Sequence, residues 1–213
     1  MRYYIADCHF FHEALNREMD HRGFASVEEM NEYMIKRWNE KVRNRDEVVI
    51  LGDLSMGNAE QTNDLLDRLQ GKLFLIVGNH DNRYLRSKTF HKERFGWIYP
   101  YAELHDDGRK VVLSHYPIAC YNGQYLKNKK GEPRTYMLYG HVHDSHDERL
   151  IEQYQQMVEK TRIPDRDGGT QSLSSHMINC FCMYSDYQPL SLDEWIALTK
   201  QRLIRCQNVE DSL

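Results

Sequence analysis

Apolar residues along this chain form two patterns, short continuous runs and stripes at helical spacing. The first stripe follows a capping box of Ser26 and Glu29 and reaches about Asn44, and a second stripe over residues 59–70 ends at Gly71. The continuous runs have the length of strands, and they cover residues 2–6, 47–51, 73–77, 110–113 and 135–139. Because strands and helices alternate through the first three runs, the pattern predicts an α/β fold with helices packed on the faces of a sheet.

The later strands lie closer together in the sequence. We expect a hairpin between residues 98–105 and 110–114, with its turn at residues 106–108. The segment 165–175 is polar and is predicted to be a loop. Two further helices are expected after capping-box pairs, Ser145 with Glu148 and Ser191 with Glu194. The chain has no repeat, low-complexity tract or linker, so we expect a single domain over residues 1–213.

Each strand-like run ends at a short polar block. The blocks share side chains that offer oxygen or imidazole nitrogen to divalent metals. In chain order they are Asp7-Cys8-His9, Gly52-Asp53, Gly78-Asn79-His80-Asp81, Ser114-His115 and Gly140-His141-Val142-His143. Ligands in α/β sheets bind outside the carboxyl ends of the strands, so blocks that are scattered along the chain can converge there. The pattern therefore predicts a two-metal hydrolytic site.

The order of these blocks resembles the calcineurin-like metallophosphoesterases, in which D-x-H, G-D, G-N-H-D, a lone histidine after a strand and G-H-x-H follow one another. The resemblance runs from Asp7 to His143. The opening Asp-Cys-His-Phe-Phe-His is similar to a small, single-domain branch of that family. One block alone would match often by chance, whereas five in order are specific. The resemblance implies a four-layer β-sandwich of two mixed sheets flanked by helices.

The resemblance also implies a pair of divalent metal ions. Its metal ligands match Asp53 as the bridge, Asp7, His9 and His143 for the first metal, and Asn79, His115 and His141 for the second. Mixed nitrogen and oxygen ligands suit Mn²⁺, our first choice, or Fe, Zn²⁺ or Ni²⁺, better than an all-oxygen Mg²⁺ or Ca²⁺ site. In the implied reaction, a hydroxide between the two metals attacks phosphorus in line with the departing oxygen.

Proton transfer is assigned to His80, which lies beside Asn79 but is not a metal ligand in the family. Its imidazole can be protonated near neutral pH and donate to the leaving oxygen, with Asp81 orienting it. Alternatively, His80 only hydrogen-bonds a phosphate oxygen. His12 and Tyr116 are expected near the substrate, although loop packing is an equal alternative for His12. No motif nominates an arginine for the phosphate, and the candidates by proximity alone are Arg17, Arg22 and Arg83.

Bulk properties narrow the class of protein. The net charge of −4 argues against a constitutive nucleic-acid coat or a membrane-surface protein. No apolar run is long enough for a membrane span, and the first residues lack a signal-peptide pattern. The five cysteines are odd in number and follow no disulfide framework. We therefore expect reduced thiols in a cytoplasmic protein.

Three functions fit these observations. A metal-dependent phosphoesterase that acts on a small phosphomonoester or phosphodiester is favoured. A nuclease of the same superfamily is less favoured, because the chain is compact and acidic and has no evident nucleic-acid-capturing domain. A non-enzymatic scaffold ranks third, because scaffolds of this kind lose ligands or the catalytic histidine, whereas this chain keeps them. The sequence leaves the exact substrate and the oligomeric state open.

Overall fold

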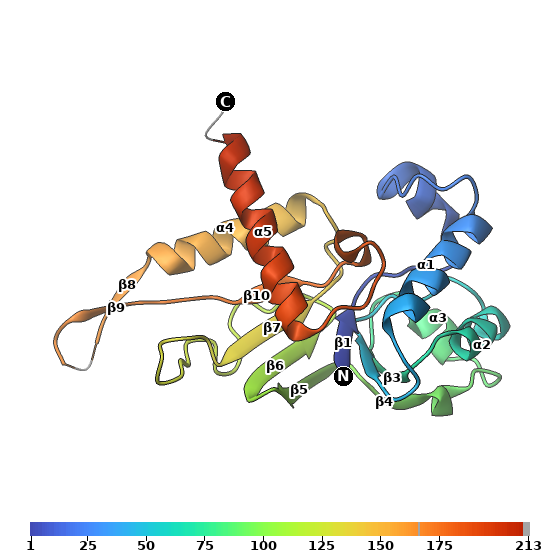
Figure 1. Ribbon diagram of the computed structural model, residues 1–213, viewed down its shortest axis with the longest axis horizontal. Coiled ribbons are helices and arrows are strands. Elements are labelled where there is room, and N and C mark those ends of the chain that lie inside the picture. The colour runs from blue at the N-terminus through green and yellow to red at the C-terminus, as the bar shows by residue number, and fades with distance from the viewer. Residues whose placement is uncertain (166, 211–213) are drawn as a thin grey trace.

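Two four-stranded sheets form the centre of the computed structural model, which describes residues 1–165 and 167–210 (Figure 1). The first sheet is parallel, in the order β1 (Arg2–Ile5), β2 (Glu47–Ile50), β3 (Lys72–Ile76) and β4 (Phe95–Tyr99). The second sheet is mixed, in the order β10 (Met177–Asn179), β7 (Thr135–Tyr139), β6 (Arg109–Ser114) and β5 (Tyr101–Asp106). The predicted α/β class, with two mixed or parallel sheets flanked by helices, is confirmed.

The helices and minor elements surround these sheets. The α-helices are α1 (Val27–Lys41), α2 (Ala59–Arg68), α3 (Asn82–Leu85), α4 (His146–Lys160) and α5 (Leu192–Glu210). The shorter helical turns are η1 (Leu15–Met19), η2 (Lys92–Arg94) and η3 (Cys182–Ser185). A separate antiparallel pair consists of β8 (Arg162–Pro164) and β9 (Thr170–Ser172). The strand β9 lies inside the segment that was predicted to be a loop, so that prediction was wrong there.

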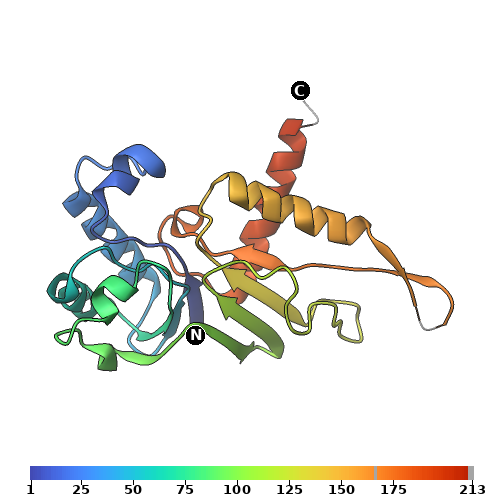
Figure 2. The ribbon, with the colours of Figure 1, turned by 180° about the vertical axis from the view of Figure 1, so that it is seen from behind.

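Three clusters of buried residues show how the layers stack. Helices α1 and α2 cover the outer face of the first sheet, and α4 covers the outer face of the second. Between the sheets, Tyr4 and Ala6 of the β1 segment pack in one cluster with Leu113 and Leu138 of β6 and β7. Neighbouring residues of β1 face opposite layers, and both faces are buried, which explains why its run is apolar without interruption. Figure 2 shows the same arrangement from behind.

The chain changes sheets at Pro100, the single residue between β4 and β5. Residues 101–106 pair antiparallel with β6, as the predicted hairpin requires, but Ile98 and Tyr99 pair with β3 instead. Proline has no N–H to donate to a ladder, so it ends one strand and permits the crossing. The hairpin was therefore placed correctly from residue 101 onward and started three residues too early.

The predicted capping pairs differ in their outcome. At α1, Ser26 accepts from the backbone N–H of Glu29 as predicted, but the Glu29 carboxylate accepts from the N–H of Ala25 rather than from that of Ser26. Ser191 and Glu194 form the predicted box at α5, and α2 has a full box of Asn58 and Gln61 that was not predicted. At α4, Ser145 accepts its hydrogen bond from Asp147 rather than Glu148. Glu148 turns inward instead, because two buried donors need its carboxylate. Within the described residues, no helix is both long enough and apolar enough to cross a membrane.

Those donors attach α4 to the second sheet. The Tyr139 hydroxyl donates to Glu148 Oε2 at 2.9 Å and Asn179 Nδ2 donates to the same oxygen at 3.0 Å. Burial raises the pKa of Glu148 to about 7 from its ordinary value of 4.5. The folded state therefore holds the Glu148 proton more tightly than the unfolded state does. The stability that this proton contributes is complete below pH 4.5 and is lost as the pH rises through about 7.

We therefore expect the unfolding free energy of the native protein to decrease, from this group alone, by about 3 kcal/mol between pH 5 and 8. In Glu148→Gln the amide oxygen still accepts both hydrogen bonds, but nothing titrates, so the decrease should shrink and the variant should be the more stable protein at pH 8. Urea unfolding of both proteins across this range measures the difference. Parallel curves for the two proteins would contradict the assignment.

Candidate metal centre

Five of the polar residues that follow the strands have left-handed backbone conformations. Their φ values are 55° for Asp7, 48° for His9, 53° for Asp53, 72° for His141 and 50° for His143. Such conformations cost of order 1–3 kcal/mol each for residues with a Cβ and persist only where the surroundings impose them. They turn the chain sharply at the carboxyl edge of each sheet. As a result, side chains from distant strands face one space.

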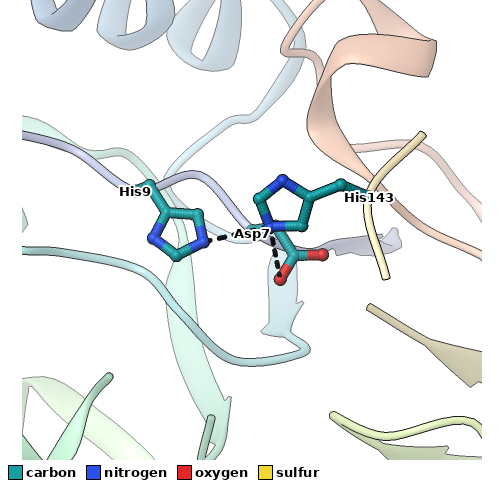
Figure 3. A group of neighbouring side chains, drawn as sticks. All are labelled: Asp7, His9 and His143. Atoms are coloured by element: carbon teal, nitrogen blue, oxygen red, sulfur yellow. Dashed lines mark hydrogen bonds and ion pairs between the residues drawn. The ribbon is translucent and has the colours of Figure 1, made fainter. Parts of the chain in front are cut away.

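The first cluster consists of Asp7, His9 and His143, whose candidate ligand atoms all lie within 4.8 Å of one another. Figure 3 shows the His143 ring next to both the His9 ring and the Asp7 carboxylate. The Nε2 atoms of His9 and His143 are 3.2 Å apart, and His143 Nε2 lies 3.8 Å from Asp7 Oδ1. Asp7 and His9 are buried. Two strand ends from different sheets therefore build this cluster.

The second cluster consists of Asp53, Asn79, His115 and His141. The three that carry a carboxylate or imidazole again lie with their ligand atoms within 4.8 Å of one another. Asn79 Oδ1 is 2.9 Å from His115 Nε2 and 3.0 Å from His141 Nδ1, which adds the amide to the group. All four residues follow strands, β2 and β3 in one sheet and β6 and β7 in the other.

Asp53, a member of the second cluster, also faces the first cluster. Its Oδ2 is 3.4 Å from His115 Nε2 in the second cluster and 3.6 Å from His9 Nε2 in the first. One carboxylate thus faces imidazoles of both groups. This is the position that the resemblance assigns to a bridging ligand, and the predicted division of residues between two sites coincides with the two clusters.

The orientation of His115 tests whether these residues fit cations. Its Nδ1 lies 2.8 Å from the carbonyl oxygen of Leu51, which only accepts, so the hydrogen is on Nδ1. In the neutral ring, Nε2 then carries a lone pair and points toward the oxygens of Asn79 and Asp53. Lone pairs that face one another in a buried space require a proton or a metal ion between them. The donor set therefore fits divalent cations.

The electrostatics of the centre agree with this orientation. Burial raises the pKa of Asp7 to about 6. Burial also opposes the charge on Asp53, but the hydrogen bond and positive charge of His115 outweigh it and bring the pKa to about 2. For His115 the two aspartates outweigh burial and raise the pKa to about 9. The ring thus holds a proton among carboxylates where a cation would take its place.

Two glycines give the carboxylates their space. A Cβ at Gly78 would lie 2.2 Å from Asp53 Oδ1, and one at Gly140 would lie 2.5 Å from Asp7 Oδ2. Neither glycine has a positive φ. Glycine is therefore required at these two positions by the close approach of a ligand side chain.

His80 lies at the mouth of the centre. Its side chain is 43% exposed, and its Nε2 is 4.0 Å from Asp53 Oδ2. Its backbone N–H donates to Asp53 Oδ1 at 2.9 Å, which fixes the residue beside the shared carboxylate. The side chain is thus free to meet a substrate, as proton transfer requires.

Asp81 occupies a different place from the one we expected. The side chain is fully buried, and its two oxygens accept four hydrogen bonds, from the N–H groups of Gly78 (2.7 Å), Asp53 (2.9 Å) and Leu54 (3.0 Å) and from the hydroxyl of Tyr84 (2.7 Å). No hydrogen bond or ion pair among the described residues joins it to His80. These contacts correct the expectation that Asp81 orients His80: the carboxylate holds the loop after β3 against the loop after β2.

The centre opens into a pocket of about 660 Å³. His12 lines this pocket and packs edge-on against His9, with ring centroids 5.6 Å apart. Tyr116 packs against the His141 ring at 4.5 Å but is not among the residues that line the pocket. Contact of either residue with substrate stays a prediction.

Two residues that matter here had no signal in the sequence. Asp20 contacts His143 Nδ1 at 2.8 Å, and Arg22 donates to the carbonyl oxygens of Asp7 and Cys8. Arg22 was a candidate for phosphate contact by proximity, but its side chain is fully buried and cannot meet a substrate. Neither residue belongs to a block, and nothing in the local pattern distinguishes them from other polar residues of the same loop.

A family model described as calcineurin-like phosphoesterase matches residues 3–195. The chain belongs to the calcineurin-like phosphoesterase family. This confirms the resemblance that the five blocks indicated. The match spans both sheets and every residue of the two clusters.

Other proteins align with this chain over most of its length. An uncharacterized protein of Methanocaldococcus jannaschii is 31% identical over 209 residues, 97% of this chain and 96% of its own. The Gene 66 protein of Mycobacterium phage L5 is 27% identical over 167 residues, 66% of this chain and 76% of its own. A crystal structure of a protein of unknown function from Aquifex aeolicus matches with a TM-score of 0.62 and 23% identity, over 91% of this chain and 96% of that one. The last comparison supports the fold alone.

The buried position of Asp81 generates a prediction. Asn at this position keeps one acceptor oxygen but faces N–H donors with an N–H₂ group, so Asp81→Asn should lower the unfolding free energy of the metal-free protein by about 2–4 kcal/mol. Asp67→Asn is the control, because the Asp67 side chain is 68% exposed, and it should change stability by less than about 0.5 kcal/mol. Unchanged stability in Asp81→Asn together with lost turnover would instead support orientation of His80.

Proposed function

We propose that this protein is a metal-dependent phosphoesterase that hydrolyses a small phosphomonoester or phosphodiester. The observation that carries the proposal is the position of Asp53, whose Oδ2 faces His9 of one cluster at 3.6 Å and His115 of the other at 3.4 Å. A pair of like charges so close together needs an anion between them, and a shared carboxylate provides one. Membership in the family supports the same chemistry.

The residues that would hold the cations are those of the two clusters. Asp7, His9 and His143 would hold the first, Asn79, His115 and His141 the second, and Asp53 would serve both. Mixed nitrogen and oxygen donors favour Mn²⁺, Fe, Zn²⁺ or Ni²⁺. Such a pair would polarise a phosphoryl oxygen and make a water molecule acidic enough to react at neutral pH.

The chain's own residues supply the rest of the reaction. His80 stands exposed at the mouth of the centre, where an imidazole can carry a proton to the departing oxygen. The pocket has more space than a phosphate group alone needs. The apolar part of its wall includes residues that are far apart in the sequence, among them Leu15, Met19, Met183 and Tyr184. A small organic group attached to phosphorus fits there.

The nuclease alternative finds less support. Among the described residues that line the pocket, none is a lysine or an arginine. Proteins that bind nucleic acid draw most of their affinity from such cations on successive phosphates. Asp144 and Asp147 line the same pocket, and they would repel a polyanion. A small phosphorylated substrate is therefore the preferred partner.

The bridging role of Asp53 is tested with Asp53→Asn. With Mn²⁺, the native protein is expected to hydrolyse p-nitrophenyl phosphate, bis-p-nitrophenyl phosphate or both, and the ratio of the two rates reports monoesterase or diesterase character. The variant should lose turnover by at least about 100-fold and bind fewer metal ions, since even partners of metal ligands change affinity or activity by 10–100-fold. Turnover near that of the native protein would refute the bridge.

Proton donation by His80 is tested with His80→Ala, which should lower turnover about 10²–10⁴-fold while metal content stays unchanged. Donation matters more for a basic leaving group, so the loss should be larger with phenyl phosphate than with p-nitrophenyl phosphate. An equal loss with both substrates would indicate that His80 only stabilises charge on the phosphate. Loss of bound metal would make its role structural.

A further inference from the structure

We propose that Arg22 and Asp20 form a brace that positions the first cluster and sets the affinity of that cluster for a divalent cation. The inference rests on the proposed function, because it takes the first cluster as a metal site. It concerns two residues that lie outside all five blocks and that act through Asp7, His9 and His143 rather than on a substrate.

Arg22 holds the backbone of the loop after β1. Its Nη1 donates to the carbonyl oxygen of Cys8 at 2.7 Å, and its Nη2 donates to the carbonyl oxygen of Asp7 at 3.0 Å. These two carbonyls belong to the peptide units that join the left-handed residues Asp7 and His9. The pairing of β1 with β2 ends at Ile5, so the ladder no longer supplies donors there. A guanidinium offers several N–H donors in a rigid fork, which suits two neighbouring carbonyls.

Asp20 connects Arg22 to the opposite wall of the cluster. Its Oδ2 accepts from Arg22 Nε at 3.1 Å and Nη2 at 2.9 Å, while its Oδ1 lies 2.8 Å from His143 Nδ1. Because the carboxylate accepts from Nδ1, it selects the tautomer of His143 whose Nε2 faces the cluster. Phe181 stacks on the same ring, with centroids 4.7 Å apart and planes at 26°. The ring is therefore held by its edge and by its face.

The brace thus joins two ligands that are 136 positions apart, Asp7 and His143, through one continuous set of hydrogen bonds. The side chains of Arg22 and Asp20 are 0% and 8% exposed, so water competes little with these bonds. Loss of either residue would free the backbone of the β1 loop or the ring of His143. Both of these determine where ligand atoms of the first cluster lie.

The second cluster is held by different groups. His115 uses the carbonyl of Leu51, and the loop that carries Asp53 is held by Asp81. Among the described hydrogen bonds, none joins Arg22 or Asp20 to a member of the second cluster. Loss of the brace should therefore weaken metal binding at the first cluster and leave the second cluster unchanged. A residue that only stabilised the fold would affect both sites alike.

The variants Asp20→Asn and Arg22→Lys distinguish an effect on the geometry of the first cluster from an effect on the stability of the whole fold. Asparagine has the shape of aspartate but not its charge, so it holds His143 Nδ1–H less firmly. Lysine keeps the charge of Arg22, but one ammonium cannot hold two carbonyls and a carboxylate together. Exposed ion pairs supply matched controls. Glu13 pairs with Arg17 at 3.1 Å and its side chain is 58% exposed, and Arg68 pairs with Glu32 and its side chain is 48% exposed. Glu13→Gln and Arg68→Lys should leave every measured quantity unchanged.

The primary measurement is calorimetric titration of the metal-free proteins with Mn²⁺, supported by the visible spectrum with Co²⁺. The native protein should bind two ions. In Asp20→Asn and Arg22→Lys one site should weaken about 10–100-fold and its Co²⁺ spectrum should change, whereas the other site keeps its affinity. Two unchanged sites, or two sites weakened equally, would overturn the brace. A native protein that binds fewer than two ions would instead overturn the proposed function.

A second measurement needs no metal. Imidazole nitrogen resonances of the metal-free native protein should show His143 with its hydrogen on Nδ1, and Asp20→Asn should shift this tautomer toward a mixture. The His143 signal is assigned by its loss in His143→Gln. An identical tautomer in Asp20→Asn would overturn the positioning role, and this result is informative even if Arg22→Lys does not fold.

Discussion

The polar centre depends on backbone that turns sharply after β1, β2 and β7, where five of its residues are held in left-handed conformations. Such conformations are unfavourable for aspartate and histidine, so other groups must hold them. Two buried charged side chains hold the backbone, one by accepting hydrogen bonds and the other by donating them. The Asp81 carboxylate collects N–H groups of the loops after β2 and β3, and the Arg22 guanidinium collects carbonyl groups of the loop after β1. Each satisfies backbone groups that the sheet no longer pairs.

Stacking of the two sheets brings the loops together. The segment of β1 belongs to the first sheet, yet Ala6 also bridges to Phe181, which follows β10 of the second. The backbone N–H of His141 donates to both oxygens of Asp7, at 3.0 and 2.9 Å. Both clusters draw ligands from both sheets. The centre can therefore form only when the apolar layer between the sheets is closed, and the stability of that layer and the geometry of the ligands are one property.

Residues next to the ligands determine how tightly the centre is packed and which side chain reaches the substrate side. Glycines beside Asp53 and Asp7 let backbone approach the carboxylates closely, which packs many ligand atoms into a small volume. His80 is exposed beside the shared carboxylate, whereas Asp81 directly after it in the sequence points into the protein. Two consecutive residues of one motif thus have different roles: His80 faces the pocket, and Asp81 stabilises the loops.

Much of the fold could be predicted from local pattern. Strand runs, helical stripes and most caps follow from side-chain periodicity, which the residues of one segment carry by themselves. The predictions failed where the structure of a segment depends on contacts with residues that are distant in the sequence. Pro100 divides an apparently continuous hairpin arm between two sheets, β9 pairs with β8 within a polar segment, and Glu148 leaves its helix cap to meet Tyr139 and Asn179.

The sequence by itself determined the types of side chain that follow each strand, because carboxylates and imidazoles at strand ends are visible as short motifs. It therefore identified the residues that the structure gathers into two clusters, including Asp53, whose carboxylate faces imidazoles of both. Only the tertiary structure decided what holds them: Asp81 accepts hydrogen bonds from backbone N–H groups, and Asp20 and Arg22 join His143 to the loop of Asp7. Supporting contacts of this kind link residues far apart in the chain through buried hydrogen bonds, and hydrogen-bond partners over such separations leave no local pattern.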